Sequence, residues 1–181
     1  AYRIRPLMPA DEPALWEMLY YAIHVPPGGA PPPRSILEAP EVARYVQGWG
    51  RPDDEGLAAE LISSNQIIGA AWLRRLTAEA PGYGYIDDAT PELSIAVAPP
   101  FRGQGIGARL LAGVLAVAQG RYAAVSLSVS ADNPALRLYH RLGFEVVRQT
   151  GGALVMSKRF ALSSTSPTDP VSPTPTRATG E

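Results

Sequence analysis

The chain contains no cysteine, and this removes several kinds of chemistry from consideration. Disulfides, thiolate metal sites and a cysteine nucleophile are all excluded, and the composition is compatible with a reducing compartment. Histidine is almost as scarce: His24 and His140 are isolated in sequence and lack the spacing of metal ligands. We therefore expect surface or hydrogen-bonded histidines and no metal site.

Excess charge and long apolar runs are missing as well. The formal net charge is −1, so a nucleic-acid partner bound mainly by phosphate neutralisation has little support. The longest apolar stretch, residues 110–118, is about half of the roughly 20 residues that a membrane span needs. The first residues show no long apolar run after a charged start, so they do not predict a signal peptide. These absences predict a cytoplasmic protein that does not enter membranes.

The composition predicts one folded domain followed by a tail. With 181 residues, of which 46% are hydrophobic, the chain can fill one core and is too short for two comfortable domains. In residues 161–181, 13 of 21 side chains are Ser, Thr or Pro and none is aromatic. Such a composition buries too little apolar surface to offset the entropy of ordering. We expect a domain over residues 1–160 and a disordered tail over 161–181.

Two spacings of hydrophobic residues alternate along the predicted domain. Apolar residues recur every second position or at helical spacing. The period of two predicts strands over residues 2–8, 57–63, 66–76, 93–98, 125–129, 144–147 and 153–156, and the helical period predicts helices over residues 11–25, 35–47, 106–117 and 134–142. The resulting order, β-α-α-β-β-β-α-β-α-β-β, predicts an α/β (α+β) fold in which helices flank a mixed sheet.

The most informative segment, residues 99–107, reads PPFRGQGIG and lies between a predicted strand and a predicted helix. A helix start presents unpaired amides and the positive end of the helix dipole, so it favours a phosphate. Gly103, Gly105 and Gly107 would let a pyrophosphate approach closely, and Arg102 can add charge. An ordinary strand-to-helix turn is the alternative. No Gly-Lys-Ser/Thr follows, and the preceding hairpin does not fit a Rossmann unit.

At these residues the sequence resembles the GNAT superfamily of N-acetyltransferases. The coenzyme motif of that family, Arg/Gln-x-x-Gly-x-Gly/Ala after a strand, is met by Arg102, Gly105 and Gly107. A second family block is matched by residues 133–144, at the expected distance downstream. The resemblance covers residues 2–160. It implies a mixed, mostly antiparallel sheet, acetyl-CoA as co-substrate, and a homodimer.

The resemblance also implies roles for individual residues. The strand before the glycines would contact the pantetheine arm through the backbone, which here means Ile95, Ala96 and Val97. The pyrophosphate would be bound by Arg102 and by the amides of Gly103, Gln104, Gly105, Ile106, Gly107 and Ala108. Asn133 matches a coenzyme contact, although it lies one residue closer to Tyr139 than in many relatives. Tyr139 matches the tyrosine that protonates the departing thiolate.

Amine acetylation also needs a base. An alkylamine has a pKa near 10, so presenting it uncharged at neutral pH costs about 4 to 5 kcal/mol. Glu92, directly before residues 93–98, is the only carboxylate of the strand that precedes the glycines, and the period of two places it on the face of Ser94 and Ala96. We expect Glu92 to be the general base, directly or through a water. Some relatives carry a glutamate on the next strand, where this chain has Ser128, and a surface carboxylate is the alternative for Glu92.

These features predict an N-acetyltransferase that passes the acetyl group of acetyl-CoA to a primary amine of a small molecule or a protein, by direct attack in a ternary complex. A non-catalytic module that binds or senses acyl-CoA is the alternative, and a dinucleotide-binding domain is a third hypothesis. The segment 24–34, with five prolines, is expected to shape the acceptor site. Trp72, Tyr83 and Tyr85 could line that site, although aromatic residues of strands are more often core.

Overall fold

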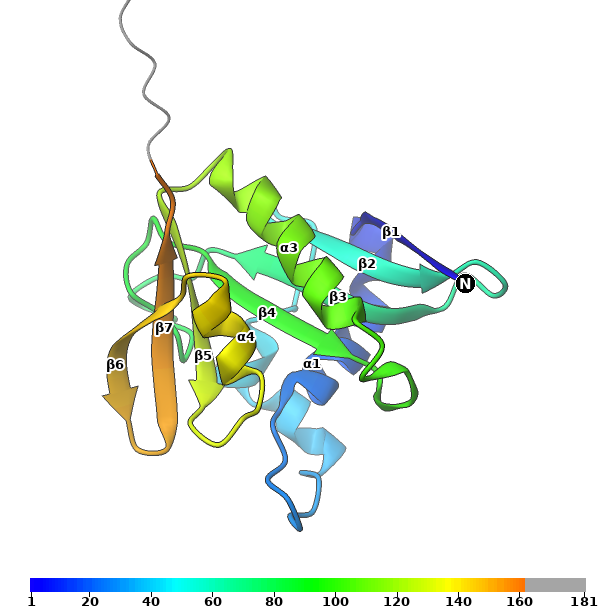
Figure 1. The fold of residues 1–181 in the computed structure, drawn as a ribbon, viewed down its shortest axis with the longest axis horizontal. Helices are drawn as coiled ribbons and strands as arrows, with labels where there is room; N and C mark the ends of the chain where they lie inside the picture. Colours follow the sequence, from blue (N-terminus) through cyan, green and yellow to red (C-terminus); the bar gives the residue numbers. More distant parts are fainter. Residues whose placement is uncertain (162–181) are drawn as a thin grey trace, which may run out of the picture.

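The structure is a computed structural model that describes residues 1–161 (Figure 1). The strands are β1 (Tyr2–Pro6), β2 (Glu55–Leu61), β3 (Ile67–Arg74), β4 (Glu92–Val97), β5 (Ala124–Ser130), β6 (Glu145–Thr150) and β7 (Ala153–Arg159). The α-helices are α1 (Glu12–Ala22), α2 (Pro40–Ala43), α3 (Ile106–Gln119) and α4 (Leu136–Arg141). Short 3-10 turns are η1 (Pro9–Asp11), η2 (Arg34–Glu38) and η3 (Pro99–Phe101). The predicted order of strands and helices is confirmed.

All seven strands form one sheet in the order β1-β2-β3-β4-β5-β7-β6. Every neighbouring pair is antiparallel except β4 and β5, which are parallel. Short turns join β2 to β3 and β6 to β7, as antiparallel neighbours allow, whereas the parallel pair needs a crossover, which α3 supplies. The mixed, mostly antiparallel sheet is therefore confirmed.

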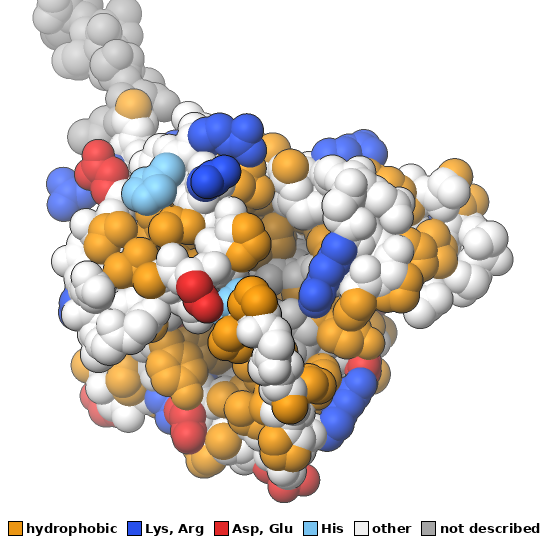
Figure 2. All heavy atoms as spheres, turned by 60° about the horizontal axis from the view of Figure 1, so that its bottom comes forward, with side chains coloured by type: hydrophobic (Ala, Val, Ile, Leu, Met, Phe, Trp, Pro, Cys, Tyr) orange, Lys and Arg blue, Asp and Glu red, His pale blue; other side chains and the backbone are white. Residues whose placement is uncertain are grey.

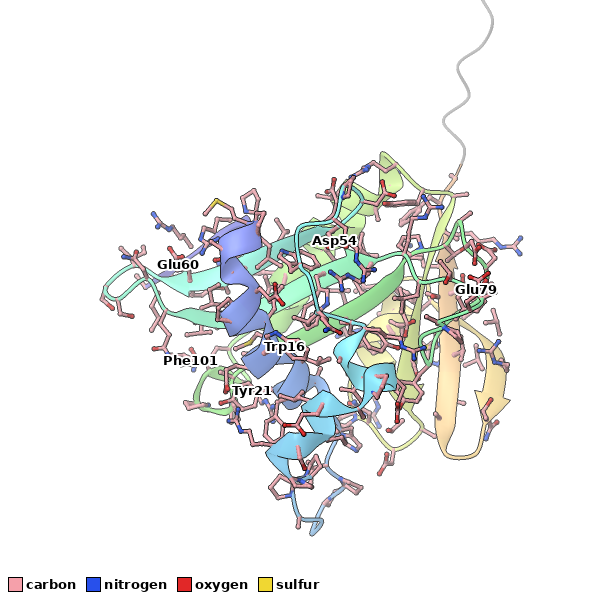
Figure 3. All side chains as sticks on the ribbon, turned by 180° about the vertical axis from the view of Figure 1, so that it is seen from behind. Trp16, Tyr21, Asp54, Glu60, Glu79 and Phe101 are labelled. Carbon is pink, nitrogen blue, oxygen red and sulfur yellow. The ribbon has the colours of Figure 1, made fainter. Side chains whose placement is uncertain are left out.

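Helices cover both faces of the sheet. On one face, α3 packs with Leu110 and Val114 at helical spacing, both fully buried (Figure 1). On the opposite face, seen from behind in Figure 3, α1 and the α2 region lie across the sheet, and Leu15 packs there in a second cluster. Side chains of β3 point alternately to the two faces and so contribute to both hydrophobic clusters. Leu73 packs in the cluster under α3, and Trp72 packs in the cluster under α1.

Two predicted helices differ from the structure. The segment 35–47 is not one helix, because the 3-10 turn η2 ends at Glu38, the backbone of Ala39 is extended, and α2 begins at Pro40. A residue before proline avoids the helical region, and proline suits the first helical turn, so the break belongs at this pair. The first helix ends at Ala22 rather than near Val25, since Ile23 is already extended.

A buried arginine fixes the α2 region to the sheet. Arg74 in β3 is 1% exposed, donates to the carbonyls of Arg44 and Gln47, and makes an ion pair of 2.8 Å with Asp54. The two carbonyls flank Tyr45, so this network determines where Tyr45 lies.

The expected tail falls outside the described residues, apart from Ala161. Among the helices of the described chain, none has both the length and the apolar character required to cross a bilayer.

Candidate active site

The site begins where β4 and β5 separate. These two parallel strands are paired at Glu92 and Ser126, where Ser126 N donates to Pro91 O at 3.0 Å. Beyond that pair the strands diverge toward their C-terminal ends (Figure 1). Diverging strands leave backbone groups and inward side chains without a neighbouring strand, and two adjoining cavities lie at this opening.

The larger cavity has a volume of about 920 Å³. The end of β4 and the glycine turn line one side, the end of α1 and the proline-rich loop line another, and α4 contributes as well. Figure 2 brings this side of the molecule forward, and hydrophobic side chains gather on it. Among the predicted site residues, those that line it are Ile95, Ala96, Val97, Arg102, Gly103, Gly107, Asn133 and Tyr139.

The glycine turn has the geometry expected of a phosphate site. Gly103 and Gly105 have φ angles of 75° and 78°, and a Cβ at either position would meet nothing within 4 Å. The turn is therefore open on its outer side. Arg109 N donates to Gly105 O at 3.2 Å, so the amides from Ile106 to Ala108 precede the first helical donor. The residues present fit a diphosphate.

Four of the predicted coenzyme residues do not line the larger cavity. Gln104, Gly105, Ile106 and Ala108 belong to the same turn and helix start but are not part of the wall of the larger cavity. The Ile106 side chain is buried in the core, so only its amide is oriented toward the turn. Gly105 and Ile106 could therefore contribute to ligand binding only through the backbone.

Arg102 joins three elements. Its Nε donates to Val97 O at 2.9 Å, and its Nη2 donates to Tyr21 O at 3.4 Å. The guanidinium thus closes the glycine turn against the end of α1 while it borders the larger cavity. The added charge that the sequence predicted is present at this wall.

The smaller cavity has a volume of about 270 Å³ and adjoins the larger one. Both cavities are bordered by Ala22, Ile23, Ile95, Asn133 and Tyr139. Glu92 and Ser94 line the smaller cavity, together with Ser128 from β5. The structure therefore brings the predicted acid and the predicted base, 47 positions apart in sequence, to the wall of one cavity.

Glu92 is buried, with 4% of its surface exposed. Its Oε1 accepts hydrogen bonds from the Tyr45 hydroxyl at 2.5 Å and from Gly84 N at 2.9 Å, and its Oε2 has no hydrogen-bond partner among the described residues. Burial raises the pKa of Glu92, while the hydrogen bonds from Tyr45 and Gly84 act in the opposite direction. Glu92 is therefore not a surface carboxylate.

Tyr45 is the residue that sequence reasoning missed. Its hydroxyl accepts from Tyr83 N at 2.7 Å while it donates to Glu92, and burial raises its pKa. Trp72 Nε1 donates to Tyr45 O at 3.0 Å, and the Tyr45 and Tyr83 rings stack with centroids 6.4 Å apart. Because Tyr45 and Glu92 meet only through packing of the α2 region on the sheet, no local pattern could indicate this pair.

The other aromatic residues considered for an acceptor pocket lie in three different environments. Tyr83 lines the smaller cavity, whereas Trp72 is a fully buried core residue. The Tyr85 hydroxyl donates to Asp88 Oδ1 at 2.5 Å, outside both cavities.

Tyr139 lies where the two cavities meet. The residue is 7% exposed, and its ring lies edge-on to the ring of Phe144, with the two ring centroids 5.8 Å apart. Burial raises the pKa of Tyr139 to about 12. The hydroxyl is therefore protonated at neutral pH, which a proton donor requires.

The segment after α1 borders the larger cavity. His24 lines this cavity, and its Nε2 lies 3.2 Å from Asp132 Oδ1. The proline-rich loop borders the larger cavity through Pro31 and Pro32, and the Tyr20 hydroxyl, which donates to Pro32 O at 2.7 Å, fixes the loop to α1. Within residues 1–161, no group of three His, Asp or Glu side chains could hold a metal.

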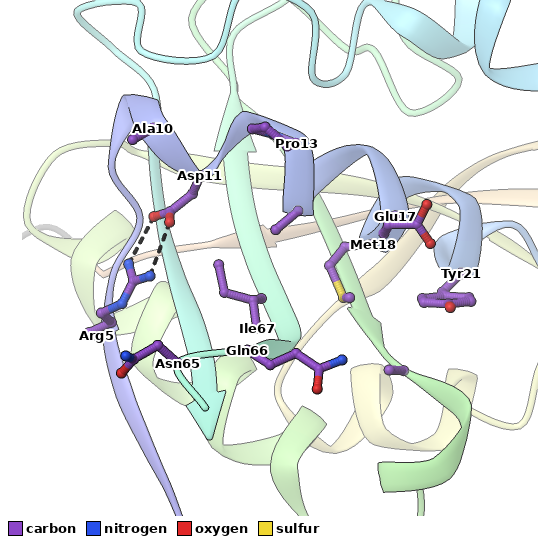
Figure 4. A pocket seen from close by; sticks show the side chains of 12 residues that line it. Arg5, Ala10, Asp11, Pro13, Glu17, Met18, Tyr21, Asn65, Gln66 and Ile67 are labelled. Atoms are coloured by element: carbon purple, nitrogen blue, oxygen red, sulfur yellow. Dashed lines mark hydrogen bonds and ion pairs between the residues drawn. The ribbon is translucent and has the colours of Figure 1, made fainter. Parts of the chain in front are cut away.

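A separate cavity of about 430 Å³ lies between α1 and the start of β3 (Figure 4). Its buried charges neutralise one another, since Arg5 bonds Asp11 through two contacts of 2.8 and 3.0 Å. It contains none of the predicted catalytic or coenzyme residues. The opening between β4 and β5 is therefore the stronger candidate for chemistry.

Comparison with known proteins identifies the family. Residues 16–144 match the model of the acetyltransferase (GNAT) family. A mycothiol acetyltransferase from Pseudarthrobacter chlorophenolicus is 31% identical over 145 residues, covering 78% of this chain and 42% of the relative. The chain therefore spans less than half the length of that curated relative.

Solved structures share the fold over most of the chain. A ribosomal-protein-alanine N-acetyltransferase from Brucella melitensis is 26% identical with a TM-score of 0.59, covering 87% of this chain and 99% of that one. The PaiA N-acetyltransferase from Thermoplasma acidophilum, solved in complex with coenzyme A, is 20% identical with a TM-score of 0.59, covering 88% of this chain and 99% of that one. With the family model matching most of its length, the chain belongs to the acetyltransferase (GNAT) family, which uses acetyl-CoA.

Proposed function

We propose that the protein is an N-acetyltransferase that passes the acetyl group of acetyl-CoA to a primary amine in a ternary complex. One observation carries this proposal: the cavity beside the glycine turn and the cavity beside the buried Glu92 meet at Tyr139. Two ligands can therefore approach each other at one point. When bound, acetyl-CoA supplies an acetyl group activated as a thioester.

The glycine turn and β4 would hold the coenzyme. Amides from Gly103 to Ala108 would bind the diphosphate at the start of α3, with Arg102 beside them. Backbone groups from Ile95 to Val97 would contact the pantetheine arm, because β5 does not pair with β4 beyond Glu92. Asn133 borders both cavities; its Oδ1 accepts from Ala135 N at 2.9 Å, which orients the side chain, and its amide nitrogen could donate to the coenzyme.

Glu92 would take the proton of the acceptor ammonium, directly or through a water. The Tyr45 hydroxyl acts as a positioning group, since its hydrogen bond orients the carboxylate and stabilises its charged form. An amide of the strand near Ile95 to Val97 would stabilise the oxyanion. The Tyr139 hydroxyl would donate its proton to the departing thiolate.

A ternary complex fits the residues better than a covalent intermediate. The chain has no cysteine to accept an acyl group. A sensor that only binds acyl-CoA would need the glycine turn but would have no use for a buried carboxylate at the adjoining cavity, because burying a carboxylate costs free energy.

A free-thiol release assay with acetyl-CoA tests the proposal. The panel should contain alkylamines, amino acids, amino acid amides and a peptide with an N-terminal alanine, and mass spectrometry should confirm the acetylated product. We expect at least one amine to raise thiol release above hydrolysis. If coenzyme A binds and no amine is acetylated, the sensor hypothesis replaces the enzyme.

Replacing Gly105 by valine tests the diphosphate site. The left-handed φ of 78° is strained for a branched side chain, and the added atoms would stand at the turn where the diphosphate must approach. We expect coenzyme A to bind at least 10-fold more weakly in isothermal titration calorimetry.

The matched control is Gly151→Val in the β6–β7 turn, where the φ is 57° and the space is equally open. It should lower thermal stability to a similar extent and leave coenzyme affinity unchanged. Equal affinity in the two variants would contradict the assigned diphosphate site.

Three further proposals rest on the sequence. They are a folded domain that ends near Phe160, a cytoplasmic location and a homodimer. Size-exclusion chromatography with light scattering would test the last of these.

A further inference from the structure

We infer that the acceptor is a small primary amine on an uncharged, mainly apolar body, with no carboxylate beside the nitrogen. Free α-amino acids would then be poor acceptors, and their amides or decarboxylated forms good ones. This inference rests on the proposed function and names the substrate class of the same site.

The first argument is the charge of the smaller cavity. Among the described residues that line it, Glu92 is the only charged one, and none is Arg, Lys or His. An α-carboxylate would therefore find no opposite charge on this wall. A cationic ammonium, in contrast, would find a carboxylate.

The second argument is the nature of the remaining wall. Aliphatic side chains from four elements surround the cavity: Leu19, Val42, Leu93, Leu127 and Val129. The other polar side chains of the wall are hydroxyls and one amide, which serve a carbonyl or hydroxyl as well as an anion: Tyr45, Tyr83, Ser94, Ser128, Asn133 and Tyr139. Apolar walls favour an apolar body and penalise a desolvated carboxylate.

The third argument is distance. In an α-amino acid the carboxylate is two bonds from the nitrogen, so an amine within reach of Glu92 brings its own carboxylate to within about 7 Å of that side chain. Like charges at about 7 Å, in surroundings with an effective dielectric constant of about 20, change affinity by roughly 10- to 100-fold. If Glu92 is protonated, the desolvation cost of the ligand carboxylate remains.

One cationic side chain, that of Arg148, lies near enough to Glu92 to affect its pKa. Arg148 in β6 acts on Glu92 through its charge, but its Nη2 donates to Tyr85 O at 3.1 Å and it does not line the cavity. We therefore assign it no part in binding the acceptor. This point is testable, because a guanidinium that bound a ligand carboxylate would favour amino acids.

The experiment compares matched acceptors that differ only beside the nitrogen. Leucine, leucinamide and 3-methylbutylamine are assayed with acetyl-CoA by thiol release and by mass spectrometry of the product, and alanine, alaninamide and ethylamine form a second set. We expect kcat/KM for the amide and the amine to exceed that for the amino acid at least 10-fold in both sets. Arg148→Gln should leave this ratio unchanged.

Each other outcome overturns the inference in a distinguishable way. Equal or greater kcat/KM with the amino acids refutes the uncharged acceptor and leaves acetyl transfer intact, and a fall in amino acid acetylation in Arg148→Gln would then identify Arg148 as the carboxylate partner. Acetylation of a peptide N-terminus but of no small amine refutes the small-molecule class. Absence of product with every probe refutes both the inference and the proposed enzyme.

Discussion

Glu92→Gln is expected to lower kcat/KM at pH 7 by about 10²- to 10⁴-fold, the usual contribution of a general base. Glutamine has nearly the same shape and can still accept hydrogen bonds from Tyr45 and Gly84 at the position of Oε1. The change therefore removes the proton acceptor and keeps the local packing. Steady-state kinetics with the best acceptor of the panel would measure it.

The pH dependence separates the base from a structural carboxylate. Burial raises the pKa of Glu92, so the acid limb of the wild-type kcat/KM profile should lie above the ordinary glutamate value of 4.5, and it should vanish in Glu92→Gln. A carboxyl with a raised folded-state pKa contributes stability below its unfolded pKa that is lost as the pH rises through the folded pKa. The melting temperature of Glu92→Gln relative to wild type should therefore be higher at pH 8 than at pH 4.

The control is Glu79→Gln, a carboxylate exposed on the loop between β3 and β4 (Figure 3). It should leave both the rate and the pH profile unchanged. A Glu92→Gln variant that keeps the wild-type rate would show that the carboxylate only orders Tyr45 and the turn at Gly84.

Tyr139→Phe is expected to reduce kcat by about 10²-fold while the Kd for coenzyme A changes less than 3-fold. The phenylalanine ring can keep the edge-on contact with Phe144, so only the hydroxyl is removed. With a pKa of about 12, that hydroxyl stays protonated and can donate to sulfur as negative charge develops there. Turnover kinetics and calorimetric titration of coenzyme A separate the two effects.

Tyr122→Phe is the matched control. The Tyr122 hydroxyl is buried, has no hydrogen-bond partner among residues 1–161 and does not border either cavity. Its removal should leave kcat unaffected. Equal losses of coenzyme affinity and kcat in Tyr139→Phe would instead indicate a binding role for Tyr139 and no proton donation.

Local patterns predicted most of the fold. The alternation of Leu93, Ile95 and Val97 indicates a strand, and the spacing of Leu110 and Val114 indicates a helix, because each period reports one buried face. The glycine turn was equally predictable, since a turn of this kind needs several glycines within a few positions of one another in sequence. The break at Pro40 was visible too, but the apolar spacing on either side of it favoured one helix.

The sequence by itself determined the order of strands and helices, the glycine turn from Gly103 to Gly107 and the presence of Tyr139 and Glu92. Only the tertiary structure decided that these two residues border one cavity, that Tyr45 bonds Glu92, and that the proline-rich loop belongs to the wall of the larger cavity. The physical reason is range: periodicity and turn geometry are set by residues a few positions apart, whereas the burial that raises the pKa of Glu92 comes from segments brought together by packing against the sheet.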